Sequence, residues 1–399
     1  MDIFQKAFDF TEARTARESG YYPYFQVIKS ESDSKVRIDG RELVMLGSNN
    51  YLGLTTHSHV RERAAEALAK YGTSCTGSRL LNGNLDIHEE LEERLARFVG
   101  KESCLVFSTG FGANIGTISA IVGRHDTAVI DKDDHASIYD GCKLSYGKVE
   151  RFEHNNVASL RESLERASRG ANGSGGALVI VDGVFSMEGD IAPLPEMLPV
   201  LKEFGARLMV DDAHASGVIG PQGNGTAAHF GVTDEVDLIM GTFSKSFASL
   251  GGFIAGDALL IDYIKHSSRP FIFSAAMAPA NVGAALGALE VMETEPQHRE
   301  RLWEVVNRMQ AGYRELGFDT GTSETPVIPI ILGDEMLVFE FWRRLRDAGV
   351  FVNPVRPPAV PAGRSLLRTS YMATHTDEQM DFVLEAFGRI GRELGVLSA

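Results

Sequence analysis

The chain has 399 residues, 44% of them hydrophobic and 23% charged, which is enough for two or three domains around a large core. Asp and Glu number 54 against 39 Lys and Arg, so the formal net charge is −15. This balance excludes broad binding to nucleic acid, because such binding relies on basic residues that neutralise phosphates. An anionic small ligand would need a local basic pocket.

The cysteines and the N-terminus indicate the compartment. Cys75, Cys104 and Cys142 are odd in number and form no CxxC pair, which disfavours a disulfide framework or a zinc knuckle. The first twenty residues mix acids and bases and lack the apolar segment of a signal peptide. The least polar long stretch, residues 271–292, is interrupted by Pro279 and by polar residues, as in a packed helix. We therefore expect a cytoplasmic protein.

The first 45 residues predict an N-terminal arm, with a helix-like start followed by an alternating pattern typical of a small hairpin. Between residues 46 and 270, short apolar runs bounded by Gly, Asp or Ser alternate with helical patterns. The runs predict buried strands at Cys104–Phe107, Thr127–Asp131, Ala177–Asp182, Arg207–Asp211 and Asp237–Phe243. The helical patterns cover His59–Tyr71, Ile87–Phe98, Asn156–Ala167 and Pro195–Phe204. This alternation predicts an α/β fold whose mainly parallel sheet carries helices on both faces.

The pattern changes near residue 271, where long helices separate only a few short strands. The helices are predicted at Ala280–Thr294, Arg299–Leu316, Met336–Ala348 and Asp377–Leu394, and the strands at Val327–Leu332, Val350–Asn353 and Ser365–Ser370. We expect three parts: an arm over residues 1–45, a large domain over 46–270 and a smaller C-terminal α+β domain over 271–399. The Gly/Ser-rich segment Ser168–Gly176 predicts a surface loop.

Residues that follow the predicted strands are the first candidates for a site, because ligands of open parallel sheets bind beyond the carboxyl ends of the strands. After the first strand, Gly110 and Phe111 stand among small residues that open a helix and can present free N–H groups to a phosphate. The alternative is an ordinary strand-to-helix turn. The spacing is not GxGxxG, which excludes the dinucleotide fingerprint of a nicotinamide-dependent oxidoreductase.

Three further strand ends carry residues able to do chemistry. His135 is flanked by small residues that leave its ring face open, although a lone histidine is more often structural. Asp211 precedes His214 by three positions, and since no further ligands are evident we expect no metal there. Lys245 lies among hydroxyls and aromatics, where a desolvated amine becomes a nucleophile, whereas most lysines are solvated and inert.

Taken together, these residues meet the needs of one cofactor. Pyridoxal phosphate requires a lysine for covalent attachment, a carboxylate that keeps the pyridine nitrogen protonated and a cup for the phosphate, and it favours an aromatic ring on its face. The residues that match, in that order, are Lys245, then Asp211, then the Gly110–Phe111 turn with Thr242 and Ser244, and finally His135.

The same residues resemble those of the α-oxoamine synthases, fold-type I pyridoxal-phosphate enzymes that condense an amino acid with an acyl-CoA and decarboxylate the product. The similarity runs from GSNNYLG at 47–53 to LLR at 366–368. Segments 77–83, 134–142, 240–246 and 269–275 are most similar to the bacterial branch that uses L-serine and a long-chain acyl-CoA. Segment 356–363 is shared with other branches. The resemblance implies that the large domain binds the cofactor.

For catalysis, the resemblance implies that Lys245 attaches the cofactor and moves the α-proton of the substrate. It also implies that Asp211 pairs with the pyridine nitrogen and that His214 donates to the phenolic oxygen of the cofactor. His135 is similar to the histidine that stacks on the ring and contacts the substrate.

For binding, the resemblance implies a phosphate site completed by a second subunit. The phosphate contacts are Gly110, Phe111, Thr242 and Ser244, with Ser274 from the partner, and Ser186 lies beside the ring. The groups around the substrate carboxylate are Asn50, Arg356 and Arg368. A residue contributed in trans implies a homodimer with shared active sites.

The implied reaction joins L-serine to palmitoyl-CoA or a similar acyl-CoA and yields 3-ketodihydrosphingosine, CoA and CO₂, the first step of sphingolipid synthesis. Two alternatives keep the chemistry but change the substrates: alanine with pimeloyl-CoA, as in 8-amino-7-oxononanoate synthase, or glycine with acetyl-CoA, as in 2-amino-3-ketobutyrate CoA ligase. Arg79, Asn82 and the segment 269–271 favour serine. A non-catalytic partner subunit is a further alternative, which the retained Lys245 disfavours. Since acyl-CoA and product are amphiphiles, acyl-chain length and peripheral contact with the inner membrane stay open.

Overall fold

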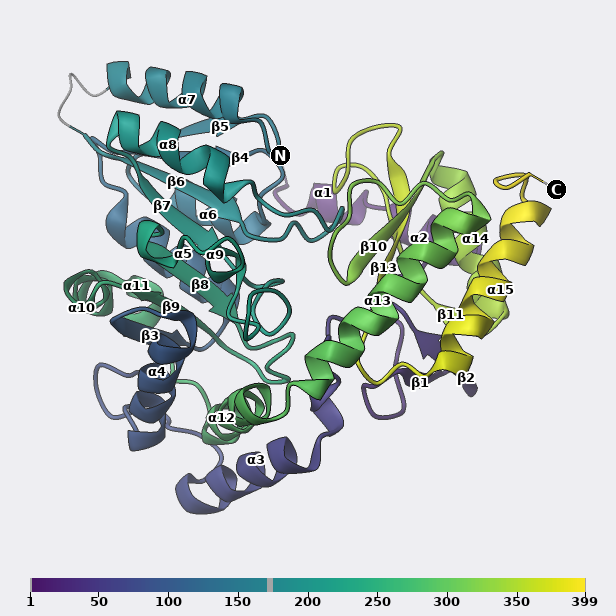
Figure 1. The fold of residues 1–399 in the computed structure, drawn as a ribbon, viewed down its shortest axis with the longest axis horizontal. Coiled ribbons are helices and arrows are strands. Elements are labelled where there is room, and N and C mark those ends of the chain that lie inside the picture. The colour runs from purple at the N-terminus through teal and green to yellow at the C-terminus, as the bar shows by residue number, and fades with distance from the viewer. Residues whose placement is uncertain (1, 171–174, 399) are drawn as a thin grey trace.

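The computed structural model describes residues 2–170 and 175–398, and its largest feature is a seven-stranded sheet (Figure 1). The strand order is β3-β9-β8-β7-β6-β4-β5. The bounds are β3 Ser103–Phe107, β4 Thr127–Asp131, β5 Lys148–Phe152, β6 Ala177–Asp182, β7 Arg207–Asp211, β8 Leu238–Thr242 and β9 Gly252–Gly256. Only β9 runs antiparallel to its neighbours in this sheet, so the prediction of a mainly parallel α/β sheet is confirmed.

All five predicted strands of this sheet form, but two further strands were missed. β5 is an edge strand with mostly polar, exposed residues, so it lacks the apolar run of a buried strand. β9 begins and ends with glycine, which weakens its strand signal. The structure explains Gly252: a Cβ there would lie 2.5 Å from the Cα of Gly110, so the strand approaches the start of the helix after β3 too closely for a side chain.

Alternate residues of the strands pack against helices on the two faces of the sheet. Leu178 and Ile180 of β6 join a cluster with α5, α6, α10 and α11, whereas Val179 and Val181 join one with α4, α7, α8 and α12. The helices are α3 Ser58–Tyr71, α4 Asp86–Val99, α5 Gly110–Ile121, α6 Ala136–Leu144, α7 Val157–Gly170, α8 Leu194–Phe204, α9 Thr226–His229, α10 Ala258–Ser267, α11 Arg269–Ile272 and α12 Pro279–Thr294. Two 3₁₀ turns are η1 Leu54–Thr56 and η2 Thr233–Glu235. Of the predicted loop Ser168–Gly176, residues 168–170 end α7, and 171–174 lie outside the described residues.

The C-terminal part contains an antiparallel sheet of order β10-β13-β12, flanked by α13, α14 and α15. The bounds are β10 Val327–Gly333, β11 Val350–Phe351, β12 Asn353–Val355, β13 Ser365–Ser370, α13 Gln297–Leu316, α14 Glu335–Asp347 and α15 Asp377–Glu393. The single strand predicted at Val350–Asn353 is wrong, because β11 pairs with β2 while β12 pairs with β13. The split places residues of one short segment in two different sheets.

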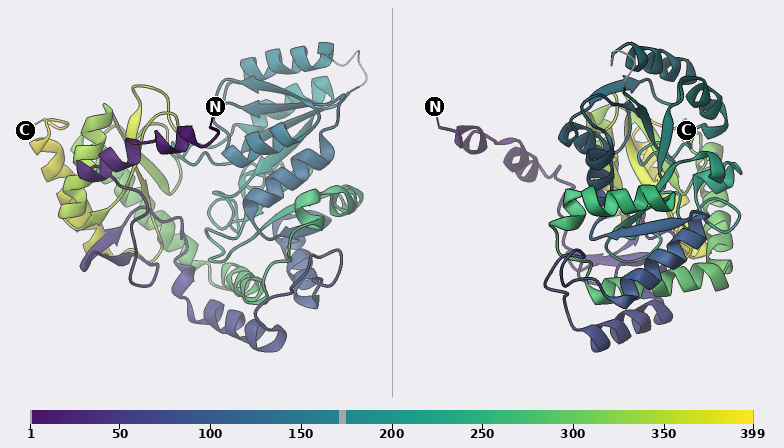
Figure 2. Two further views of the ribbon diagram at one scale, coloured as in Figure 1. Left: turned by 180° about the vertical axis from the view of Figure 1, so that it is seen from behind. Right: turned by 90° about the vertical axis from the view of Figure 1, so that its left-hand side faces the viewer.

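The N-terminal residues form two short helices and a hairpin. Helices α1 (Gln5–Phe8) and α2 (Glu12–Glu18) project away from the rest of the molecule (Figure 2), and β1 (Lys35–Ile38) pairs with β2 (Arg41–Met45). The division at residues 45 and 270 stays a prediction. α12, which lies beyond the second boundary, packs against α3 and the large sheet, and α13 then leads to the C-terminal sheet (Figure 1). No helix of the described residues has the length and apolarity needed to cross a membrane.

Candidate active site

A cavity of about 270 Å³ opens at the carboxyl ends of the central strands. Eight of the predicted site residues line it together: Gly110, Phe111, His135, Asp211, His214, Thr242, Ser244 and Lys245. They come from the segments that follow β3, β4, β7 and β8, as expected for strands whose carboxyl ends meet at one edge of the sheet.

Lys245 lies in the connection from β8 to β9, and its half-buried side chain lines this cavity. Burial lowers the pKa of Lys245 to about 8, against the opposing attraction of Asp211 and Asp182. Backbone hydrogen bonds hold the connection closed, with Ala248 N donating to Lys245 O at 3.0 Å. An amine with this pKa is partly neutral near pH 7 to 8, which makes it a nucleophile and a base.

A chain of hydrogen bonds links Asp211 to His135. Asn114 Nδ2 donates to Asp211 Oδ2 at 2.6 Å and to Ser137 Oγ at 2.8 Å, and Ser137 Oγ lies 2.7 Å from His135 Nδ1. Since Ser137 Oγ accepts from Asn114, its own proton is available for His135 Nδ1. Burial and the nearby Lys245 lower the pKa of His135. His135 is therefore neutral, with its proton on Nε2.

His214 is held in the same tautomer by a tyrosine. The hydroxyl of Tyr51 lies 2.6 Å from His214 Nδ1, and both side chains are buried. Burial raises the pKa of Tyr51 to about 12, and burial together with Lys245 lowers the pKa of His214 well below its ordinary value. The hydroxyl has one proton and a second acceptor, Asn49 Oδ1, at 3.4 Å. Because His214 Nδ1 is much closer, at 2.6 Å, we assign the proton to the Nδ1 bond, so that His214 keeps an Nε2 proton to donate to a ligand.

The start of α5 forms a cradle for an anion. Thr109 caps this helix, because its Oγ1 accepts from Gly112 N at 2.9 Å. The N–H groups of Gly110 and Phe111 have no hydrogen-bond partner among the described residues. A Cβ on Gly110 would lie 2.7 Å from Thr242 Oγ1, so only glycine brings the backbone this close to the hydroxyl. Thr242 Oγ1 in turn lies 3.0 Å from Ser244 Oγ.

Asp182, at the end of β6, is a cavity residue that the sequence analysis did not select. Its side chain is buried, and its Oδ1 has no hydrogen-bond partner among the described residues. Burial, reinforced by the charge of Asp211, raises the pKa of Asp182 well above its ordinary value. The environment of Asp182 therefore disfavours its ionised form, by burial first and by the neighbouring Asp211 second. Asp182 ends a predicted strand, so the strand-end rule had the signal to find it.

The other predicted residues do not line this cavity. Arg368 is buried and donates through Nε to Ser186 O at 2.5 Å and through Nη2 to Asn49 Oδ1 at 3.0 Å. Burial lowers its pKa. Asn50 is also buried, with Nδ2 donating to Thr55 Oγ1 and with Oδ1 lacking a partner among the described residues.

Three residues used in the sequence analysis lie outside the cavity altogether. Arg356 is exposed and pairs with Glu335 at 2.8 Å, and Ser274 is exposed after α11. Arg79 is buried in a two-bond pair with Glu92, at 2.8 and 2.9 Å. Within a single chain, Arg79 therefore supports packing rather than substrate choice.

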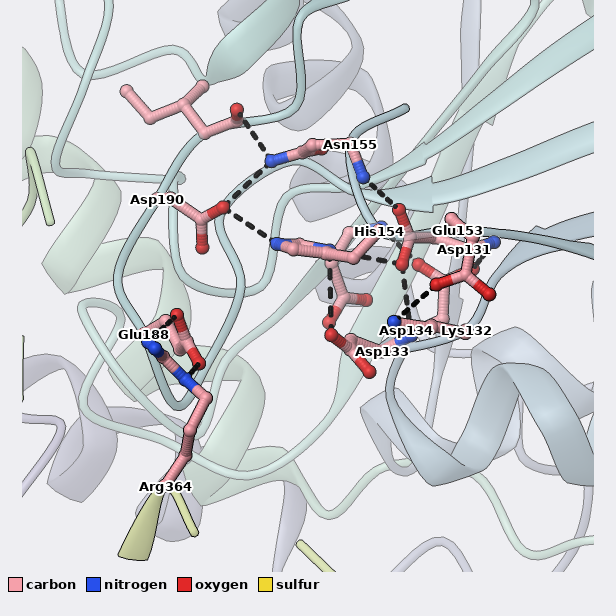
Figure 3. A network of polar contacts seen from close by, with 12 residues as sticks. Asp131, Lys132, Asp133, Asp134, Glu153, His154, Asn155, Glu188, Asp190 and Arg364 are labelled. Carbon is pink, nitrogen blue, oxygen red and sulfur yellow. Dashed lines mark hydrogen bonds and ion pairs between the residues drawn. The ribbon is translucent and has the colours of Figure 1, made fainter. Parts of the chain in front are cut away.

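A second cavity of about 470 Å³ adjoins the first, and both are lined by His135. Its polar wall is the network of Figure 3, in which the His154 ring lies between Asp131 and Asp190. Ser186 and the segment from Pro358 to Pro361 also line this cavity. The two cavities thus share His135.

Two groups in the described residues have ligand atoms close enough together for a metal ion. His57, Glu295 and His298 meet where α12 joins α13, and Asp131, Asp133 and His154 line the second cavity. In the second group, the carboxylates already bind the imidazole as ion pairs. Neither group lies at Asp211 and His214, where the sequence analysis considered a metal.

The first cavity fits pyridoxal phosphate by its donors and acceptors. It offers the half-buried Lys245 amine, the buried Asp211 carboxylate and two histidines of lowered pKa. Beside its two hydroxyls lie two backbone N–H groups that have no partner among the described residues. This set matches the aldehyde, the pyridine nitrogen, the phenolic oxygen and the phosphate of the cofactor.

Comparisons with known proteins agree with this fit. The model of the aminotransferase class I and II family matches residues 41–387. The chain is 51% identical to the serine palmitoyltransferase of Sphingobacterium spiritivorum, over 96% of this chain and 95% of the relative. It is 41% identical to the 8-amino-7-oxononanoate synthase of Lysinibacillus sphaericus, over 97% and 98% of the two chains.

Solved structures point to the same group. Serine palmitoyltransferase of Sphingomonas wittichii superposes with a TM-score of 0.95 at 38% identity, covering all of both chains. A structure described as SPT with PLP internal aldimine gives the same TM-score at 37% identity, also with full coverage of both chains. The chain therefore belongs to the aminotransferase class I and II family of fold-type I enzymes, and within that family to the α-oxoamine synthases.

Proposed function

We propose that the chain binds pyridoxal phosphate and condenses L-serine with a long-chain acyl-CoA such as palmitoyl-CoA. A bond forms between the serine α-carbon and the acyl carbon, while the thioester bond and the bond to the serine carboxylate break. The products are 3-ketodihydrosphingosine, CoA and CO₂. The observation that carries the proposal is that the half-buried Lys245 lines one cavity with Asp211 and His214, in a chain 51% identical to a serine palmitoyltransferase.

The residues of the first cavity divide the work between them. Bound pyridoxal phosphate supplies an electron sink for the α-carbon of an attached amino acid. Asp211, which Asn114 holds by a hydrogen bond to Oδ2, pairs with the pyridine nitrogen. Lys245 takes the α-proton and returns a proton after CO₂ has left. His214 donates its Nε2 proton to the phenolic oxygen.

His135 has a different partner at each stage. Its neutral ring stacks on the cofactor, and its Nε2–H donates first to the serine carboxylate and then to the thioester carbonyl. Hydrogen bonding of Nδ1 to Ser137 holds this tautomer throughout. Arg368, Asn50 and Arg356 neutralise or hydrogen-bond the serine carboxylate, with Ser186 beside the ring.

We assign the functional unit to a homodimer. Ser274 lies outside the cavity of its own chain, so it reaches a phosphate only in a second copy. Apolar side chains are also exposed on segments next to the cavity and to Ser274, with Leu81 80% and Phe273 78% exposed. Bare apolar surface of this kind is typical of an interface.

The N-terminal arm has the same character. Ile3, Phe4 and Phe8 on and before α1 are more than half exposed, and the arm projects from the body (Figure 2). We assign it to contact with the second copy. Removing residues 1–20 is expected to weaken dimerisation in sedimentation experiments. If the truncation changes only binding to lipid vesicles, the arm contacts a membrane instead.

Spectral titration followed by product analysis tests the proposed function. We expect a visible absorption band of bound cofactor that changes with serine at lower concentration than with alanine or glycine. With palmitoyl-CoA, mass spectrometry is expected to detect 3-ketodihydrosphingosine. A response to alanine together with turnover of pimeloyl-CoA would instead assign the chain to the 8-amino-7-oxononanoate branch.

A further inference from the structure

His154 connects two loops that are far apart along the chain, one at Asp131 and the other at Asp190. It lies in the turn between β5 and α7, with Nδ1 3.1 Å from Asp131 Oδ1 and Nε2 2.8 Å from Asp190 Oδ2 (Figure 3). Its ring also contacts Phe185 edge to face, at 4.4 Å between centroids. One imidazole therefore bridges the end of β4 and the loop after β6.

The residue after His154 repeats the bridge. Asn155 has a positive φ of 50°, and this conformation brings its backbone and side chain to the same two carboxylates. Asn155 N donates to Asp131 Oδ2 at 2.8 Å, and its Nδ2 donates to Asp190 Oδ2 at 2.7 Å. Asp131 is 1% exposed, and besides His154 and Asn155 its carboxylate accepts from Asp133 N at 2.9 Å.

Both carboxylates stand close in sequence to predicted site residues. Asp131 ends β4 and leads into the turn that carries His135. Asp190 closes the loop that carries Ser186, since Phe185 N donates to Asp190 O at 3.0 Å. Ser186 O in turn accepts from Arg368 Nε. A shift of either carboxylate would therefore move His135 or Arg368 relative to the first cavity.

The charge of His154 suits this position. Burial would lower its pKa, but the hydrogen bonds to Asp131 and Asp190 outweigh burial and raise the pKa to about 10. Asp133 Oδ2, at 3.8 Å, is the third carboxylate that faces the ring. The imidazolium donates from both nitrogens at once, which a neutral ring cannot do.

We propose that His154 is a positioning residue, which holds the His135 turn and the Ser186 loop at the separation needed for the bound amino acid. This inference rests on the proposed function, because it gives those two segments their roles. His154 touches neither the first cavity nor the reacting atoms, so it acts through its carboxylates. Its loss is expected to affect the amino-acid half of the reaction more than the binding of acyl-CoA.

The test compares three variants of the cofactor-loaded enzyme. His154→Gln keeps hydrogen bonding but loses the charge, and we expect kcat to fall by about tenfold to a hundredfold, as for a small misplacement of reacting groups. The serine concentration at the midpoint of the spectral titration should rise, while the KM for acyl-CoA stays within about twofold of wild type. His154→Arg keeps a charge that donates to both carboxylates, and the adjoining cavity has room for it. It should regain most of the lost kcat.

His59→Gln is the matched control, because His59 on α3 pairs with one carboxylate, that of Glu290 on α12, and lines neither cavity. It should behave as wild type. Equal losses of kcat in His154→Gln, His154→Arg and His59→Gln would overturn the proposal. Wild-type kinetics in a folded His154→Gln enzyme would also overturn it. If His154→Gln does not fold, Asp190→Asn leaves the Asp131 pair intact and should give the same pattern. Absence of turnover in wild type would refute the proposed function alone. The role of His154 would still be tested, because the spectral titration with whichever amino acid binds responds to the position of the two loops.

Discussion

His214 in the first cavity and His154 in the wall of the second are both largely shielded from solvent, yet one ring is neutral and the other is positively charged. His214 contacts a tyrosine hydroxyl and lies near cations, so its pKa is lowered and it stays neutral. His154 lies between carboxylates, so its pKa is raised to about 10 and it stays charged. The partners, and not burial alone, decide the charge. A neutral histidine serves as a proton donor to a ligand, whereas a charged one serves as a fixed ionic link.

The largest effect is expected when the amine of the first cavity, Lys245, is removed. Lys245→Ala is expected to abolish the visible absorption band and to lower kcat by at least about a thousandfold, because the nucleophile and base are lost together. Absorption spectra and single-turnover product formation provide the measurement. Lys265→Ala, an exposed lysine on α10, is the control. Substantial turnover by the alanine variant would remove Lys245 from the chemistry.

The second test uses the pH dependence of stability. The folded-state pKa of His154 is raised above its unfolded value, so its contribution is fully present below about pH 6.5 and is lost as the pH rises toward 10. His154→Gln should lower the free energy of unfolding by about 3 kcal/mol at pH 6 and by much less at pH 10. Urea denaturation at the two pH values measures this. A loss that is independent of pH would contradict the charged state.

The third test concerns the buried cation between the two regions. Arg368→Lys keeps the charge but loses the planar guanidinium, whose Nε and Nη2 donate to Ser186 and Asn49. We expect the KM for serine to rise about thirtyfold and the KM for acyl-CoA to change by less than about twofold. Arg364→Lys, which alters a partly exposed pair with Glu188, should leave both constants unchanged. Equal increases in the two constants would reject Arg368 as a carboxylate contact.

The smallest effect is expected from the hydroxyl that sets the tautomer of His214. Tyr51→Phe removes the donor to Nδ1 and should lower kcat about fivefold, the value of one hydrogen bond of about 1 kcal/mol. The cofactor band is expected to shift in wavelength, since His214 would lose its fixed Nε2 proton. Unchanged spectra and rates would show that His214 keeps its tautomer without the tyrosine.

The cavity residues could be predicted because the fold makes strand ends converge. Asp211 and Thr242 lie at the ends of neighbouring strands with clear apolar runs, so their proximity follows from the topology. The contacts that set charge and tautomer could not be predicted in this way. Tyr51 and His214 are 163 positions apart, and no local sequence pattern predicts their hydrogen bond. The same holds for the pairing of His154 with Asp190.

Other misses have local causes. β9 has too many glycines to give a strand signal, and the two short strands at 350–355 look like one because periodicity cannot show a change of sheet. The roles predicted for Arg356 and Ser274 stay predictions, since both residues are exposed and neither lines the cavity of a single chain.

The antiparallel strand β9 also bears on the order in which the site forms during folding. The loop that carries Lys245 is closed by contacts of short sequence separation, such as Thr242 Oγ1 to Gly251 O, nine positions apart. The carboxylate partner is fixed by Asn114, 97 positions from Asp211. Closing a short loop costs less chain entropy than closing a long one. The reactive lysine therefore sits in a hairpin that can form early, and the groups that tune it arrive only when distant segments of the chain have assembled.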